Sequence, residues 1–130
     1  MIAALTTGII DAAADATGFN SSRVHYGEAP LKTGYPYLII FGVEDEPDYD
    51  GTTQHEKARA QFSVRGLSLA KCQEAAEAMQ DVFDLGESNI TVSGWDVIES
   101  IRVLGVPPRK FNNVWVWDMD YTFWITKARS

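Results

Sequence analysis

The two clearest patterns in this chain adjoin each other in residues 57–86, KARAQFSVRGLSLAKCQEAAEAMQDVFDLG. In the first ten residues, small or apolar side chains alternate with polar ones, and this period of two predicts a strand with one buried and one wet face. The apolar side chains then recur every three or four positions, which is the spacing of an amphipathic helix. Ser68 suits the N-cap of this helix and Gly86 its C-cap. The stretch therefore predicts a strand followed directly by a helix.

The flanking segments supply another helix and further strands. The run YLIIFGV is apolar throughout, which predicts a strand buried on both faces. We expect a helix over 2–16 and strands over 23–27, 37–43, 90–105 (bent, or broken in two near Gly94) and 114–126. One face of the last strand carries Trp115, Trp117, Met119, Tyr121, Phe123 and Ile125. This order predicts an α+β fold, a mostly antiparallel β-sheet with two α-helices packed on it, in a single domain over 1–130.

The composition narrows the class of protein. A net charge of −7 argues against a protein that grips nucleic-acid phosphates, because that affinity comes from clustered Lys and Arg. It is compatible with a surface past which DNA slides. The single cysteine, Cys72, excludes an internal disulfide and fits a reducing compartment. The chain has no signal-peptide pattern and no run of the ~20 apolar residues that a membrane helix needs. We expect a soluble intracellular protein with no membrane partner.

The segment GVEDEPDYDGTTQHE, residues 42–56, is densely acidic and contains His55. Its carboxylates do not match the ligand spacing of a calcium loop, and one histidine is too few for a typical zinc site. We therefore expect no metal here, but a solvated hairpin loop that joins strands 37–43 and 58–65. The carboxylates are Glu44, Asp45, Glu46, Asp48, Asp50 and Glu56.

No set of residues predicts catalysis or a cofactor. Ser68, in GLSLA, lies between a strand and a helix as a hydrolase nucleophile would, but both histidines precede it in the chain. Cys72 lies on the apolar stripe of its helix, which is typical of an inert buried thiol. His25 and His55 share no motif. We expect a protein that is not an enzyme.

One charge asymmetry stands out. Residues 44–50 are strongly negative, while residues 102–113 carry Arg102, Arg109 and Lys110. If the two segments lie on opposite sides of the domain, they are complementary between copies, and such a head-to-tail contact can close into a ring. The simpler alternative, which the sequence favours, is a pair of separate solvated loops.

The layout of the chain resembles a known family. A short strand and a proline-containing loop lead into YPYLII, a charged segment follows, and FSVRG then precedes the amphipathic helix that begins SLAK. A long aromatic strand closes the chain. Over roughly residues 20–126 this resembles the small tail terminator, or tail completion, proteins of long-tailed bacteriophages. The resemblance rests on layout and on these stretches, since there is no catalytic signature.

The resemblance implies a structural role in the virion, at the head–tail junction, after assembly in the host cytoplasm. Such proteins form a ring, usually a hexamer, that caps the tail tube, stops its polymerisation and meets the head–tail connector. DNA passes through the ring without specific binding. The resemblance assigns no contact to single residues, so our candidates for the oligomer interface or channel come from charge: Glu44, Asp45, Glu46, Asp48, Asp50, Arg109 and Lys110.

Two other interpretations stay open. The first is another neck component, such as a head-completion protein, which would share the ring but bind the portal side. The second is a cellular α+β module that binds a small molecule in a pocket lined by Trp95, Trp115 and Trp117. Aromatic side chains on one strand face belong more commonly to a core than to a pocket.

Overall fold

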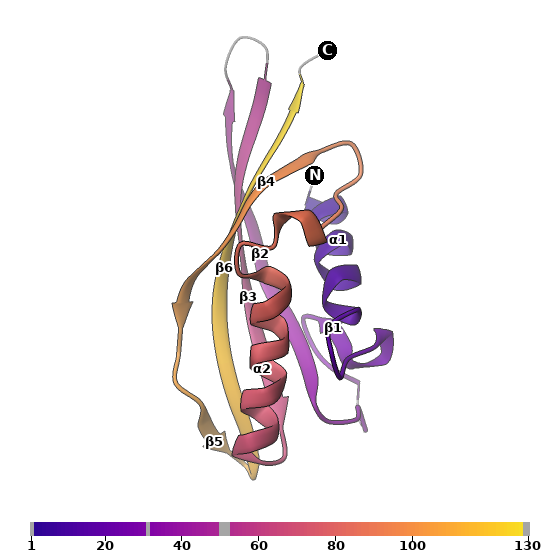
Figure 1. Cartoon of the computed structure of the whole chain (residues 1–130), viewed down its shortest axis with the longest axis vertical. Coiled ribbons are helices and arrows are strands. Elements are labelled where there is room, and N and C mark those ends of the chain that lie inside the picture. Colours follow the sequence, from indigo (N-terminus) through magenta and orange to yellow (C-terminus); the bar gives the residue numbers. More distant parts are fainter. Residues whose placement is uncertain (1, 31, 50–52, 129–130) are drawn as a thin grey trace.

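The computed structural model describes residues 2–30, 32–49 and 53–128. Two α-helices cover one face of a long twisted sheet (Figure 1). The helices are α1 (Ile2–Ala14) and α2 (Leu69–Phe83), and single 3₁₀ turns occur at Ser21–Arg23 and Glu87–Asn89. The strands are β1 (Val24–Tyr26), β2 (Tyr37–Tyr49), β3 (Thr53–Gly66), β4 (Asp96–Gly105), β5 (Arg109–Phe111) and β6 (Val114–Ala128).

Within the described residues these six strands form one sheet in the order β1-β2-β3-β6-β4, with β5 also paired to β6. Only the β1–β2 pair among them is parallel. The two longest strands, β3 and β6, pair over their full lengths, from Thr53 opposite Ala128 to Gly66 opposite Trp115. The predicted α+β fold, a mostly antiparallel sheet with two helices, is confirmed.

The core lies between the helices and the sheet. The alternation seen in the sequence places Phe62 of β3 and Tyr121 of β6 on the helix side, where both are fully buried. The ring of Phe83, from the end of α2, meets Phe62 edge to face at a centroid distance of 4.8 Å. Leu5 and Ile9 of α1 complete this cluster with no exposed surface. As predicted, four side chains of one face of β6 are buried: Met119, Tyr121, Phe123 and Ile125.

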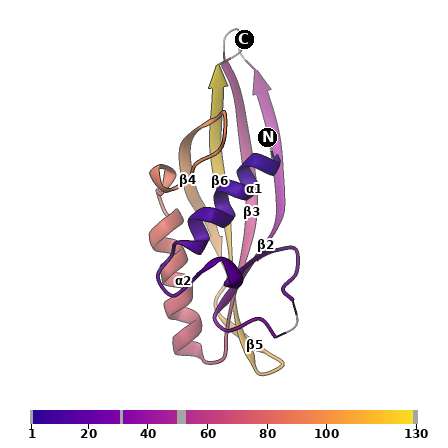
Figure 2. The ribbon, with the colours of Figure 1, turned by 90° about the vertical axis from the view of Figure 1, so that its right-hand side faces the viewer.

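The acidic segment is a strand rather than the solvated loop that the sequence predicted. β2 continues to Tyr49 and β3 begins at Thr53, so the hairpin that we expected is present but far longer (Figure 2). Glu44 lies opposite Arg59, and Glu46 opposite Lys57. Each carboxylate thus has a cation across the strand, which favours the strand pairing that the acidic residues alone would oppose.

Residues 109–113 also differ from the expected loop. They form β5 and a two-residue turn, in which Asn112 and Asn113 have φ of +49° and +65° and Phe111 lies opposite Val114. Positive φ at both central residues is the signature of a type I′ hairpin turn, which asparagine tolerates better than most residues. The Asn-Asn pair between apolar residues was therefore the signal for a hairpin here.

Candidate interaction surfaces

The sheet is much longer than the helices, and its two ends differ in chemistry (Figure 1). We call the end where β2 leads into β3 the hairpin end, and the end where β5 leads into β6 the turn end. On β6, Lys57 of β3 is opposite Trp124, whereas Lys110 of β5 is opposite Trp115. Nine positions of one strand therefore separate the two ends, about 30 Å at ~3.3 Å per residue.

The hairpin end carries the acidic candidates. Glu44 and Glu46 are exposed and Asp45 is half-buried. With Lys57 and Arg59 they line a shallow polar groove. The guanidinium of Arg59 also lies 3.6 Å from a carboxylate oxygen of Asp120, which belongs to β6. The negative charge here is thus partly balanced within the chain.

The other two acidic candidates cannot be placed. Asp50 lies outside the described residues, and of Asp48 only the backbone, in β2 opposite His55, is described.

Glu56 differs from its acidic neighbours in being buried. Only 5 % of the residue is exposed, and its Oε1 accepts a hydrogen bond from Gln54 Nε2 at 3.3 Å. Oε2 has no hydrogen-bond partner within the described structure. Burial, followed by the charge of Asp45, raises the pKa of this carboxyl. Glu56 is therefore a buried carboxyl group with one unsatisfied oxygen rather than a solvated surface charge.

The turn end carries the basic candidates together with an exposed aromatic ring. Arg109 donates from Nη2 to Asp118 Oδ2 at 2.8 Å, so this cation is largely engaged within its own chain. Lys110 is exposed, and Phe111 beside it is 67 % exposed. Arg102, the third cation of the segment, lies elsewhere and pairs with Asp84 at 3.2 Å. The structure therefore places the acidic and basic candidates at opposite ends of the molecule and does not bring them together within one chain.

A second groove lies on the open face of the sheet near the hairpin end. Its apolar surface comes from Ile98 and Trp124, which are 55 % and 38 % exposed. The groove measures about 440 Å³ and is lined by Thr53, His55, Ile98, Glu99, Trp124 and Thr126. The ammonium of Lys57 lies 5.5 Å from the ring centroid of Trp124, which is within the range of a cation–π contact. Sequence patterns could not reveal this groove, because three separate strands build it.

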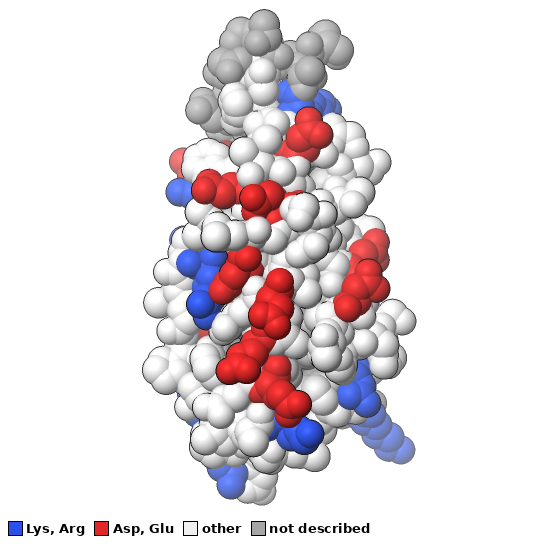
Figure 3. Space-filling model, in the orientation of Figure 1, with Lys and Arg blue, Asp and Glu red and all other residues white. Residues whose placement is uncertain are grey.

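The helix-covered face is acidic (Figure 3). Glu74, Glu77 and Asp81 follow one another at helical spacing on the exposed side of α2, and two further exposed carboxylates are Asp11 on α1 and Asp15 directly after it. Of these five carboxylates, that of Glu74 has a cation nearby: its Oε2 lies 3.6 Å from Lys71 Nζ. The spacing of three and four residues on α2 was the signal for this stripe, which sequence reasoning did not identify as a surface.

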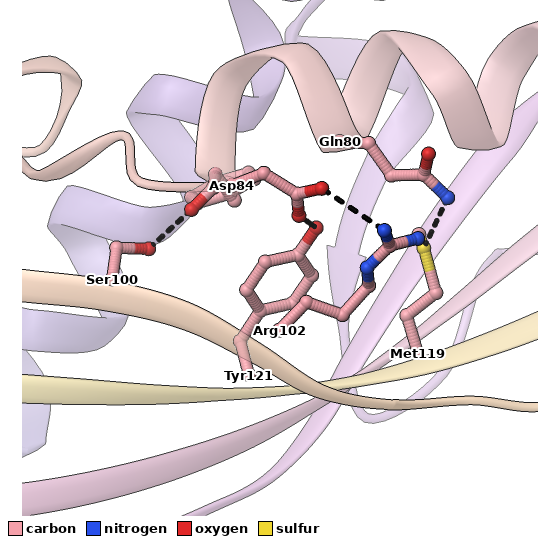
Figure 4. A network of polar contacts seen from close by, with 7 residues as sticks. Gln80, Asp84, Ser100, Arg102, Met119 and Tyr121 are labelled. Carbon is pink, nitrogen blue, oxygen red and sulfur yellow. Dashed lines mark hydrogen bonds and ion pairs between the residues drawn. The ribbon is translucent and has the colours of Figure 1, made fainter.

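A partly buried polar network ties the end of α2 to the sheet (Figure 4). The Tyr121 hydroxyl donates to Asp84 Oδ1 at 2.5 Å, and Arg102 Nη2 lies 3.2 Å from Asp84 Oδ2. The Ser100 hydroxyl donates to the carbonyl oxygen of Phe83 at 2.6 Å. Burial, and then the hydrogen bond to Asp84, raises the pKa of Tyr121 far above its usual value. These contacts satisfy the buried hydroxyls of Ser100 and Tyr121, while the Asp84 and Arg102 side chains are 34 % and 36 % exposed.

The residues that we considered as catalytic candidates in the sequence are placed as follows. Ser68 caps α2 as predicted, its Oγ accepting from the Lys71 amide at 3.2 Å. Cys72 has no exposed surface, and burial raises the pKa of its thiol to about 11, which keeps it protonated. His25 Nε2 lies 2.9 Å from the Ser22 carbonyl oxygen, and His55 lines the groove beside Trp124.

The described residues contain no cluster of three or more His, Cys, Asp or Glu side chains suited to a metal ion. No described helix is long and apolar enough to cross a membrane.

The three tryptophans proposed for a small-molecule pocket do not converge. Trp117 packs against the core, and Trp115, opposite Gly66, lies near the turn end. Trp95 adjoins the residue opposite Thr126 and holds the ammonium of Lys127 at 5.0 Å from its ring centroid. Trp95 and Trp115 are thus separated by most of the length of β6, so the three rings do not line the common pocket of that alternative interpretation.

Comparison with known proteins gives a match of structure only. No family model and no curated protein sequence matches the chain. A chain in the virion of a native gene transfer agent particle has a similar structure, with a TM-score of 0.69, 13 % sequence identity, and coverage of 97 % of this chain and 94 % of that one. A second solved protein, which carries an identifier in place of a descriptive name, has a TM-score of 0.64 at 14 % identity, covering 95 % and 91 %. At such identities the likeness establishes a shared fold.

Proposed function

We propose that this chain is a structural virion protein that forms a ring capping the tail tube, ends tail polymerisation and joins the tail to the head connector. The observation that carries this proposal is the similarity, over nearly the whole of both chains, to a component of a gene transfer agent virion. The resemblance of the sequence layout to tail terminators supports the same role independently, because it was drawn from residues rather than from the fold.

The surfaces of the molecule support an assembly role rather than a catalytic one. Two ends of different charge and one open sheet face give an elongated subunit the means to contact neighbours in a fixed direction. The acidic stripe on the helices and the net charge of −7 would keep DNA from adhering as it passes. A ring with this surface toward its hole would act as a passive conduit.

The first experiment is light scattering behind size exclusion over a range of concentrations, with and without magnesium. Magnesium is included because a divalent cation can screen carboxylates that repel across a subunit contact. A closed ring of about six copies in either condition is the expected result. A tight dimer at every concentration would contradict the proposal and favour a cellular binding module.

A second experiment separates a tail terminator from a head-completion protein. The chain is mixed with tail tubes of the particle that encodes it and, separately, with its DNA-filled heads. We expect it to co-sediment with tubes and to appear at one tube end in electron micrographs. Binding to heads alone would assign the chain to the portal side of the neck.

A further inference from the structure

We infer that the β5–β6 turn of one copy docks into the Trp124 groove of a second copy, head to tail. The inference rests on the proposed homo-oligomer and identifies the two surfaces that would join its subunits. The surfaces are the turn end, with Lys110 and Phe111, and the groove formed by Ile98, Glu99 and Trp124 with their neighbours.

The turn end has the properties of a rigid apolar knob. Phe111 projects with two thirds of its surface exposed, from a strand that is paired to β6 up to the turn itself. The Asn112–Asn113 turn has only two residues, so the ring is held on a short, defined hairpin. An exposed aromatic ring on such a support is costly in water and favours burial against a partner.

The groove has the complementary properties. Ile98 and Trp124 provide an apolar floor, and the volume of about 440 Å³ is sufficient for one aromatic side chain. Glu99 borders the groove, and the exposed Asp96 and Glu46 lie on the same end of the sheet. Glu99 of the groove is thus opposite in charge to Lys110 of the knob, and Lys57 is a cation beside the same groove. The contact of Lys57 with the Trp124 ring shows that this ring also accepts a cation at its face.

A single chain cannot make this contact with itself. Phe111 is opposite Val114 of β6, ten positions from Trp124 on the same strand, or about 33 Å at ~3.3 Å per residue. The proposed contact must therefore lie between two chains, and because knob and groove are different surfaces, two copies joined in this way make a heterologous contact. Such contacts either close into a ring or continue as a filament, which agrees with the proposed ring.

The experiment uses two variants of the full chain, each with a substitution in one of the two proposed surfaces. Phe111→Ser removes the knob and keeps the groove, while Ile98→Ser replaces part of the apolar groove floor by a small polar side chain and keeps the knob. Both side chains are more than half exposed, so the variants should fold, as circular dichroism will check. We expect each variant alone to be monomeric at concentrations at least tenfold above those at which the wild-type chain assembles. Leu85→Ser, at a residue 74 % exposed outside both surfaces, is the control and should assemble normally.

Mixing the two variants gives the sharpest result. The intact groove of one and the intact knob of the other can form one contact, so a 1:1 dimer should appear, and nothing larger. Lys110→Glu should weaken assembly at low salt by about tenfold, and adding Glu99→Lys to it should restore the lost affinity. General stickiness does not produce a 1:1 dimer from two monomeric variants, and a symmetric interface would give a wild-type dimer instead of a larger assembly.

The outcomes distinguish this inference from the proposed function. A ring formed equally well by Phe111→Ser would overturn the docking inference and leave the ring proposal intact. A wild-type chain that stays monomeric at every concentration would also overturn it, whereas end-binding to tail tubes would still support the terminator role. Monomeric single variants together with a 1:1 mixed dimer would establish the contact.

Discussion

At the scale of single residues, the contribution of a polar side chain to stability cannot be read from its residue type. Tyr121 and Glu56 are both buried on the helix side of the sheet. The Tyr121 hydroxyl is hydrogen-bonded, whereas Glu56 Oε2 has no hydrogen-bond partner among the described residues. An acidic residue in a charged segment and a tyrosine in an aromatic strand thus have opposite effects on stability, and each can be measured.

Tyr121→Phe should lower the free energy of unfolding by about 1.5 kcal/mol, because it removes a hydrogen bond to a charged carboxylate while keeping the ring. Urea denaturation followed by circular dichroism measures the change. Tyr26→Phe, at an exposed tyrosine of β1, is the matched control and should have almost no effect. Equal stability of the two variants would mean that the Asp84 contact contributes nothing.

Glu56→Gln should stabilise the protein at pH 7 and leave its stability nearly unchanged at pH 4. The pKa of Glu56 is raised in the folded chain, so the folded state favours the protonated carboxyl. Its stability contribution is fully present below the unfolded pKa of 4.5 and is lost as the pH rises through the folded value. Gln54 can still donate to the amide oxygen. Denaturation at both pH values measures the difference, and a variant that is less stable at pH 7 would contradict the expectation.

At the scale of elements, close approach decides where the helices lie. α1 crosses the segment before β4 at Gly8, where an added Cβ would lie 2.3 Å from the carbonyl oxygen of Thr91. The position of α1 therefore depends on the absence of one side chain, which a helix pattern in the sequence does not reveal.

Gly8→Ala should destabilise the fold by roughly 1–3 kcal/mol, the usual cost of overpacking. Helix propensity alone predicts the reverse, since alanine favours a helix by about 1 kcal/mol over glycine. Thermal denaturation therefore distinguishes the two effects by sign. Gly105→Ala, where an added Cβ meets nothing within 4 Å, is the control. A higher midpoint for Gly8→Ala would show that α1 can shift away from Thr91.

At the scale of the whole molecule, charge is distributed by face and by end. The helix side is acidic, one end of the sheet combines carboxylates with an apolar groove, and the other combines cations with Phe111. An elongated subunit of this kind has a direction, which a head-to-tail ring requires and a symmetric dimer does not.

The wild-type chain should not retard duplex DNA in a gel at low salt, because its net charge is −7 and its helix-covered face is acidic. Replacing Glu74, Glu77 and Asp81 by lysine should produce binding that is lost as the salt concentration rises. Replacing the same three residues by glutamine is the matched control for a loss of charge alone. Salt-sensitive binding by the wild-type chain would contradict a passive channel.

The local patterns of this chain were sufficient for much of the fold. Alternation placed Phe62 and Tyr121 on the buried face, helical spacing gave α2, and Ser68 gave its cap, because these features depend on residues close together in the sequence. The number of helices and the antiparallel sheet followed from the order of these segments. The charge asymmetry between residues 44–50 and residues 102–113 was also visible in the sequence.

Pairing between distant residues decided the rest. The acidic segment became a strand because Arg59 and Lys57 lie across from its carboxylates, and the sequence alone cannot state which residues face each other. Register along β6 set Glu46 and Lys110 about 30 Å apart and kept Trp95 from Trp115. The groove at Trp124 exists because β3, β4 and β6 bring their side chains together there. Local periodicity specifies which face of an element is buried, whereas register and strand order specify which surfaces meet, and only the folded chain fixes those.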